Sequence, residues 1–300
     1  MTTSTTREKG PRVFMDYDQS ELDRCYDQAN WAPNMALVHA RSDAASAAVA
    51  ARLGGPERLA YGSAGIEKLD LFKARQQGAP IFVYVHGGAW RSGSSSRCHG
   101  PAEMFVDAGC NYIALDFNNV IETGGDLMPM IDQVRRAVVW IYRNAKSFGA
   151  DPEQLYVYGH SSGAHLAGNI LTTDWPKRYD APMSMIKGGM VTSGMYELAP
   201  VRLSARSSYV NFTDEMVEEL SSIRHIGLLN CPVIVSYGDQ ESPEFQRQNR
   251  EFAAAVEAAG KPVKLQVGIG LNHFEIAETL GNPYSFLGRS ALELIGAKGQ

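Results

Sequence analysis

Short apolar runs alternate with amphipathic segments along most of this 300-residue chain. The run IFVYV at residues 81–85 is apolar without interruption, as expected for a strand that is buried on both faces. Similar runs predict further strands, at residues 111–117, 155–159, 188–194, 232–238 and 263–269. Helical segments separate most of these runs, and this alternation is typical of a mostly parallel sheet flanked by helices. The pattern therefore predicts an α/β fold, with its chemistry at the carboxyl ends of the strands.

The predicted helices differ in how clearly the sequence marks them. The clearest spans residues 126–149, where apolar side chains recur at three- and four-residue steps. Pro129 stands in its first turn and Gly149 ends it. Weaker patterns predict shorter helices, at residues 102–109, 164–173 and 243–260 and from Pro283 onward.

The N-terminal part is predicted to be a polar arm followed by two helices. Residues 1–18 are polar, and we expect them to be flexible. Ser20 is the expected N-cap of a short helix over residues 20–31. An alanine-rich helix over residues 42–53 should stop at the glycine pair 54–55. With no repeat or linker evident, we expect one domain over the whole chain.

Composition and charge exclude several classes of function. The chain has 28 basic and 33 acidic residues, a formal charge of −5 and no block of like charge. Nothing electrostatic therefore favours nucleic acid or an anionic membrane surface as a partner. The N-terminus lacks the apolar segment of a signal peptide, and no run approaches the ~20 apolar residues of a membrane span. We expect a cytoplasmic protein with a small-molecule partner, and the sequence leaves a homodimer open.

The spacing of cysteine and histidine indicates no metal or cofactor site. Four scattered cysteines form no CxxC pair, and free thiols of a reducing cytoplasm are expected at Cys25, Cys98, Cys110 and Cys231. The seven histidines lack metal-ligand spacing. Neither a GxxxxGK[ST] loop nor a GxGxxG after a strand supports nucleotide binding. We therefore expect no metal and no organic cofactor.

One serine stands in a pattern that favours nucleophilic catalysis. Ser161 is the centre of GHSSG at residues 159–163, directly between a predicted strand and a predicted helix. A nucleophile elbow needs small residues two before and two after the serine, because the turn is tight, and Gly159 and Gly163 meet that need. GxSxG alone occurs often by chance, but the strand–turn–helix context predicts that Ser161 is a nucleophile.

Two further segments could complete such a site. The glycine pair of HGGAW at residues 86–90 follows an early strand, so its N–H groups could form an oxyanion hole. We assign the donors to Gly88, Ala89 and Ser162; an ordinary Gly-Gly turn is the alternative. His273 follows the last predicted strand and is the expected general base.

The carboxylate that would orient this base is ambiguous, because Asp239 and Glu241 both follow the strand at residues 232–238. Residue type alone favours aspartate, although Asp239 could equally cap the next turn. The residues themselves therefore do not decide whether Asp239 or Glu241 orients the histidine.

Several segments resemble the hormone-sensitive-lipase branch of the α/β-hydrolases, and most closely its arylformamidase-like esterases. The resemblance covers most of the chain and is carried by HGGAW, GHSSGAHLAG, SGMYELAPV, SPEFQRQ and ELDRCYDQANWAPN. It implies an α/β-hydrolase fold whose pocket is covered by residues 19–60 and 195–230. The family's acid directly precedes the SPEF element, which implies Glu241. The chain departs from the family at Ala89, where a bulky aromatic is usual, at Ser162, where alanine is usual, and at Glu241, where aspartate is usual.

Together with this resemblance, the residues predict a serine hydrolase with the triad Ser161, His273 and Glu241, with Asp239 as the alternative acid. The resemblance implies an ester or amide (N-acyl or formamide) bond in a small, aromatic substrate, cleaved through an acyl-enzyme. Substrate contacts are expected from Trp90, His160, Tyr26 and Trp31. Three alternatives remain: a strict N-formylkynurenine formamidase, a lyase or thioesterase that reuses the triad, and a non-catalytic ligand-binding protein.

Overall fold

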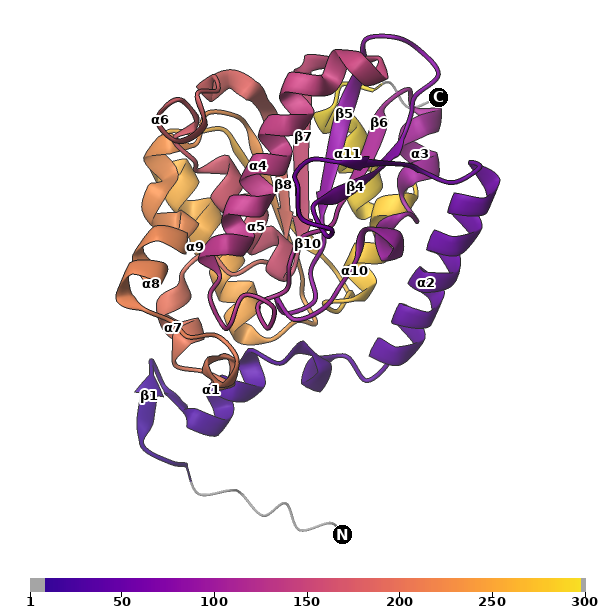
Figure 1. Ribbon diagram of the computed structural model, residues 1–300. Helices are drawn as coiled ribbons and strands as arrows, with labels where there is room; N and C mark the ends of the chain where they lie inside the picture. Colours follow the sequence, from indigo (N-terminus) through magenta and orange to yellow (C-terminus); the bar gives the residue numbers. More distant parts are fainter. Residues whose placement is uncertain (1–8, 298–300) are drawn as a thin grey trace.

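The computed structural model describes residues 9–297, which form an α/β fold around an eight-stranded sheet (Figure 1). The strand order is β10-β9-β8-β7-β5-β6-β4-β3. Neighbours from β10 to β6 pair in parallel, whereas β4 pairs antiparallel with β6 and with β3. The strands are β3 (Glu57–Ala60), β4 (Lys68–Phe72), β5 (Ala79–Val85), β6 (Asn111–Leu115), β7 (Ala150–His160), β8 (Ile186–Thr192), β9 (Val233–Gly238) and β10 (Val263–Gly268). The predicted mostly parallel sheet is confirmed.

Eleven α-helices and seven short 3₁₀ turns of the described residues connect and cover these strands. The helices are α1 (Gln19–Cys25), α2 (Met35–Arg52), α3 (Ala102–Asp107), α4 (Met128–Asn144), α5 (Ser162–Leu171), α6 (Trp175–Tyr179), α7 (Leu198–Arg202), α8 (Asp214–Leu220), α9 (Pro243–Ala258), α10 (Glu275–Glu278) and α11 (Phe286–Leu294). The 3₁₀ turns are η1 (Gln28–Trp31), η2 (Ser95–Cys98), η3 (Ala145–Phe148), η4 (Met183–Met185), η5 (Ala205–Ser208), η6 (Ser222–Leu228) and η7 (Thr279–Gly281).

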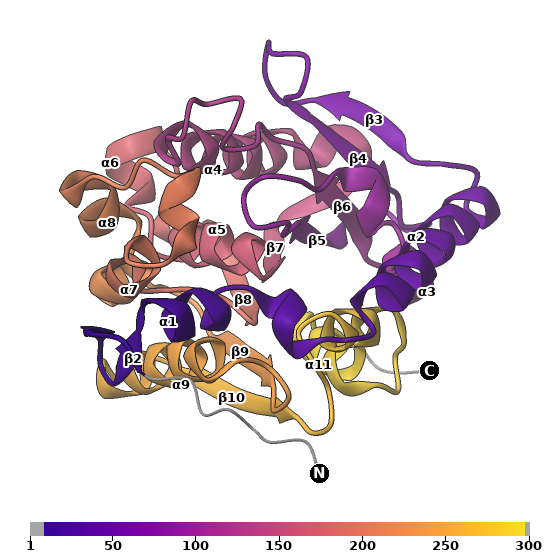
Figure 2. The same ribbon diagram turned by 90° about the horizontal axis from the view of Figure 1, so that it is seen from below.

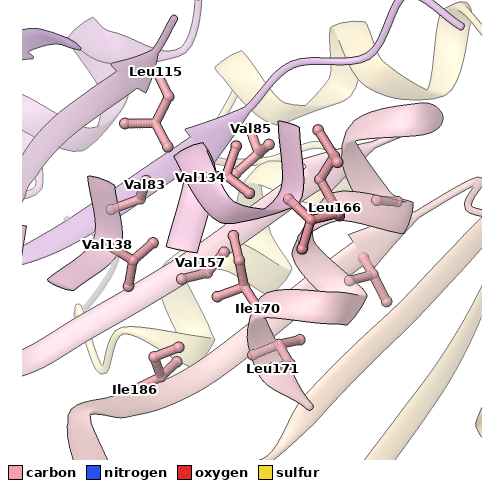
Figure 3. Close-up of a cluster of buried hydrophobic side chains, with 14 of the residues drawn as sticks. Val83, Val85, Leu115, Val134, Val138, Val157, Leu166, Ile170, Leu171 and Ile186 are labelled. Atoms are coloured by element: carbon pink, nitrogen blue, oxygen red, sulfur yellow. The ribbon is translucent and has the colours of Figure 1, made fainter. Parts of the chain in front are cut away.

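Alternating side chains of β5 show why this strand is apolar throughout. Val83 and Val85 face α4 and α5 in one core cluster, which Figure 3 shows from close by. Phe82 and Tyr84 belong to the core cluster on the other face, where Phe82 stacks on Phe105 of α3 at 4.1 Å between ring centroids. A strand buried on both faces needs apolar residues at every position, as the run at residues 81–85 predicted.

In the N-terminal part, the structure differs from three predictions. The cap of α1 is Asp18 rather than Ser20: its side chain accepts from the N–H of Glu21, whose carboxylate accepts from the N–H of Asp18 in return. The expected helix over residues 20–31 is α1 followed by the separate turn η1. Helix α2 begins seven residues earlier than predicted and ends before the glycine pair 54–55, whose φ angles are +79° and +83°.

The expected flexible arm does not extend to residue 18. Residues 12–18 form a small hairpin of β1 (Arg12–Phe14) and β2 (Tyr17–Asp18), while residues 1–8 lie outside the described residues. From there the chain passes along the carboxyl ends of the parallel strands (Figure 2). It contacts the segment around η5 there, since Gln19 donates to the carbonyl of Leu203 and Asp23 accepts from the N–H of Ala205.

Strands β3 and β4 were not anticipated, because charged residues interrupt their apolar pattern. Asp70 of β4 is buried and accepts hydrogen bonds from Ser95 and His99, while Arg58 of β3 bridges Asp70 and Asp116. Burial alone would raise the pKa of Asp70, but the hydrogen bonds from His99, Ser95 and Arg58 lower it to about 2. This network ties the segment around residue 95 to the sheet.

Candidate active site

Ser161 occupies a strained turn between β7 and α5. Its φ of +59° and ψ of −127° lie in a region that side chains rarely adopt. The chain on either side packs too closely for a side chain: a Cβ on Gly159 would lie 2.1 Å from the carbonyl oxygen of Gly163. A Cβ on Gly163 would lie 2.1 Å from the carbonyl oxygen of Val85. Both glycines are therefore required by close packing, and the turn projects the Ser161 hydroxyl beyond the sheet.

The structure brings Ser161, His273 and Glu241 together from three separate loops. Ser161 Oγ lies 2.8 Å from His273 Nε2, and His273 Nδ1 lies 3.0 Å from Glu241 Oε2. Glu241 is only 2% exposed, and its other oxygen accepts from Ser193 Oγ at 2.6 Å and from the N–H of Gly238 at 2.7 Å. These bonds hold the carboxylate so that one oxygen faces the imidazole. Ser193 was not predicted as part of the site, although it directly follows β8 at the carboxyl end of the strand.

Asp239, the other candidate acid, lies elsewhere. Its carboxylate accepts from the N–H of Gly270 at 2.7 Å and from the side chain of Gln240 at 3.0 Å. It thereby fastens the turn that leads to His273, while the carboxylate of Glu241 contacts the imidazole. The geometry favours Glu241 as the partner of the histidine.

His160 forms a hydrogen bond with the loop that carries His273. Its Nε2–H donates to the carbonyl oxygen of His273 at 2.8 Å, and the two rings are 4.8 Å apart. Burial, and secondarily the positive charge that His273 can carry, lower the pKa of His160 to about 3. The ring therefore stays neutral at ordinary pH.

This lowered pKa predicts that acid destabilises the protein through His160. In the unfolded chain the pKa of His160 returns to about 6.5, so between pH 6.5 and 3 the unfolded state binds a proton that the folded state does not. The free energy of unfolding should fall as pH drops through this window, by up to about 1.4 kcal/mol per pH unit from this residue. Urea unfolding of wild type and His160→Gln between pH 7.5 and 5 measures it. The variant should have the shallower slope, and equal slopes would refute the assignment.

The loop at residues 86–90 presents unused backbone donors beside Ser161. Gly88 and Ala89 have φ angles of +112° and +55°, and their N–H groups form no hydrogen bond with any of residues 9–297. The N–H of Ser162 is the first of α5 and has no partner inside the helix. The Ser162 hydroxyl accepts from the N–H of Trp90 at 3.1 Å, which links this loop to the elbow.

A cavity of about 490 Å³ opens over Ser161; we call it the Ser161 cavity. Of the four residues expected to contact substrate, Tyr26 and His160 line it, together with Tyr209 and Phe274, which the sequence did not single out.

Trp90 and Trp31 are not among the residues that line the Ser161 cavity, so their substrate contacts stay predictions. The Trp90 indole is 2% exposed and donates from Nε1 to His165 Nδ1 at 3.2 Å. The Trp31 indole donates to the carbonyl of Arg24 at 3.0 Å. Each ring also contacts an arginine, Trp90 with Arg206 at 5.2 Å and Trp31 with Arg24 at 5.1 Å.

Membrane-spanning helices, metal-binding clusters and disulfides are all absent from residues 9–297. None of the helices there is long and apolar enough to cross a membrane. No group of three or more His, Cys, Asp or Glu side chains in this part of the chain is placed to hold a metal ion. All four cysteines are free thiols.

Comparison with known proteins places this site in a family. Residues 69–187 match the family model BD-FAE. A kynurenine formamidase of Danio rerio is 32% identical over 299 residues, which cover 93% of this chain and 97% of the relative. One of Salmo salar is 30% identical over 305 residues, covering 94% and 98%.

Solved structures show the same fold. A putative thioesterase from Silicibacter sp. TM1040 superposes with a TM-score of 0.78 at 22% identity and covers 92% of this chain and 98% of its own. The esterase Est2 of Thermogutta terrifontis has a TM-score of 0.63 at 18% identity, covering 81% and 91%. The chain therefore belongs to the α/β-hydrolases, in the family of the kynurenine formamidases.

Proposed function

We propose that this protein is a serine hydrolase that cleaves the ester or N-acyl amide bond of a small aromatic substrate. The observation that carries the proposal is the hydrogen-bonded chain from Ser161 through His273 to Glu241, with bonds of 2.8 and 3.0 Å, at the floor of a 490 Å³ cavity. The aromatic rings of Tyr26, Tyr209 and Phe274 around the cavity support an aromatic substrate.

The geometry supports a two-step reaction. Ser161 Oγ attacks the substrate carbonyl while His273 Nε2 takes its proton, and Glu241 stabilises the imidazolium. The resulting oxyanion is bound by the N–H groups of Gly88, Ala89 and Ser162. Collapse of the intermediate breaks the scissile bond, and His273 returns the proton to the leaving alcohol or amine. Water, deprotonated in turn by His273, then hydrolyses the acyl-Ser161 ester and regenerates the enzyme.

A second candidate, a strict N-formylkynurenine formamidase, is favoured by one observation. The chain aligns with 97% and 98% of the length of two kynurenine formamidases, at 32% and 30% identity. The broader proposal is supported by a more distant similarity to the esterase LipQ of Mycobacterium tuberculosis. LipQ is 25% identical over an alignment that covers 67% of this chain and 52% of LipQ.

Rates on two substrate classes separate the candidates. The values of kcat/KM are measured on N-formylkynurenine and on p-nitrophenyl acetate and butyrate. Our proposal predicts hydrolysis of both the formamide and the esters, whereas a strict formamidase would leave the esters untouched. A purely ligand-binding protein would hydrolyse neither, and that outcome would refute the proposal.

A further inference from the structure

Arg206 is a buried cation that lacks a counter-charge. It lies in η5, is 7% exposed and lines the Ser161 cavity. Its guanidinium donates from Nη1 to Tyr209 Oη and from Nη2 to the carbonyl of Tyr26, both at 2.9 Å, while Nε has no partner. Both acceptors are neutral, and no carboxylate of residues 9–297 forms an ion pair with Arg206. Buried charges are normally paired, so this exception calls for a cause.

A comparison with Arg135 shows how this chain treats a buried arginine elsewhere. Arg135 is 5% exposed, and its Nη1 lies 3.5 Å from the carboxylate of Glu219. Arg206 is buried to a similar degree and lines the Ser161 cavity, and there residues 9–297 supply no such partner. The Trp90 ring, 5.2 Å from the Arg206 guanidinium, offers a cation–π contact but no negative charge.

A second unpaired arginine lies beside the first. Arg91 also lines the Ser161 cavity, and its guanidinium lies 4.2 Å from the ring centroid of Tyr209. It forms no ion pair among the described residues. Tyr209 therefore contacts both cations, one at its hydroxyl and one at its ring. A third arginine of the cavity, Arg97, is neutralised by Asp43, with bonds of 2.7 and 3.0 Å.

The other acids that line the cavity are occupied by backbone groups. Asp23 accepts from the N–H of Ala205 at 2.6 Å, and Asp27 accepts from the N–H of Ala29 at 3.2 Å. Asp27 is also exposed to solvent. None of these carboxylates forms an ion pair with Arg206 or Arg91, so among residues 9–297 both guanidinium groups are left free to pair with the negative charge of a bound molecule.

We propose that Arg206, assisted by Arg91 and the Tyr209 hydroxyl, binds a carboxylate of the substrate. The substrate is then an anionic aromatic ester or amide, and the preference for it over a neutral analogue is set by Arg206. A guanidinium matches a carboxylate in shape and charge, and it binds one more tightly in a partly buried site than in water. The proposal rests on the proposed function of the same cavity, and it adds the class of substrate.

Matched substrates test it. The three isomers of formamidobenzoate share the scissile formamide with the corresponding formamidobenzamides, which replace the carboxylate by a neutral carboxamide. For at least one isomer, wild-type kcat/KM should favour the carboxylate by about ten- to a hundredfold. Arg206→Met should remove most of this preference, and Arg206→Lys, which keeps the charge, should retain part of it.

Arg202→Met is the matched control. Arg202 lies in α7 of the same region, is already paired with Asp214 at 2.6 Å and does not line the cavity. This variant should keep the wild-type preference. Circular dichroism checks that each variant is folded. If Arg206→Met does not fold, Arg91→Gln, which changes an exposed side chain, should weaken the preference in its place.

Binding separates a failure of this inference from a failure of the proposed function. Calorimetry with the Ser161→Ala variant measures the affinity for each carboxylate and carboxamide without turnover. Equal affinity for both members of every pair, or a preference that survives in folded Arg206→Met, would overturn the inference and leave the hydrolase intact. A preference for carboxylates in binding, combined with no hydrolysis by wild type, would support the anion site and contradict the hydrolase.

Discussion

Replacing Ser161 by alanine should lower kcat/KM by about four to six orders of magnitude. The hydroxyl is the group that would attack the substrate, and no other hydroxyl of residues 9–297 forms a hydrogen bond with His273 Nε2. Stability should change little, because the substitution removes one oxygen from a side chain that borders a cavity. Steady-state rates on the best substrate, with urea unfolding of both proteins, measure the two effects.

Ser162→Ala is the control for this experiment. It removes the neighbouring hydroxyl, which accepts from the N–H of Trp90, but it keeps the Ser162 N–H that we propose binds the oxyanion. The loss should be at most about a hundredfold, since one hydrogen bond supports the loop. A Ser161→Ala variant with wild-type turnover, or a Ser162→Ala variant as inactive as it, would refute the assignment of the nucleophile.

Replacing Glu241 by glutamine should lower kcat by about three to four orders of magnitude, whereas Asp239→Asn should cost less than about tenfold. Glutamine keeps the shape of Glu241 but cannot stabilise the imidazolium, and it can present an N–H where the histidine needs an acceptor. Asparagine at position 239 keeps an oxygen that can still accept from the N–H of Gly270. The two variants are compared at saturating substrate.

The pair also tests which carboxylate serves the histidine. A large loss in Asp239→Asn with near-normal rates in Glu241→Gln would exchange the two roles. If the two variants lose activity to a similar extent, this would contradict our assignment of different roles, with Glu241 as the catalytic acid and Asp239 as the residue that stabilises the turn before His273.

The turn at Ser161 and the place of His273 beside it could be predicted from the sequence. Gly159 and Gly163 stand where a Cβ would collide with backbone, so their spacing around Ser161 marks the turn in the sequence itself. His273 was found by its position after the last strand. Both predictions depend on the order of elements rather than on the direction of any side chain.

Other parts of the site depend on the directions in which side chains point, and no local sequence pattern predicts these. Asp239 and Glu241 both follow β9, and only the course of the loop decides that the longer side chain contacts His273. Trp90 and Trp31 are aromatic, but neither is among the residues that line the Ser161 cavity.

The sequence could not single out Arg206, because what distinguishes it is that no carboxylate of residues 9–297 pairs with its buried guanidinium, which bonds only to neutral oxygens. The cap of α1, by contrast, was visible in the sequence: Glu21, three residues after Asp18, marks a capping box that Ser20 cannot make.

Labelling with a fluorophosphonate, followed by peptide mass spectrometry, tests directly whether Ser161 is a nucleophile that His273 and Glu241 activate. We expect a single adduct on Ser161 in the wild-type protein, formed far more slowly in Glu241→Gln because the imidazole is no longer held. Absence of an adduct, or an adduct on another residue with Ser161 unmodified, would contradict it.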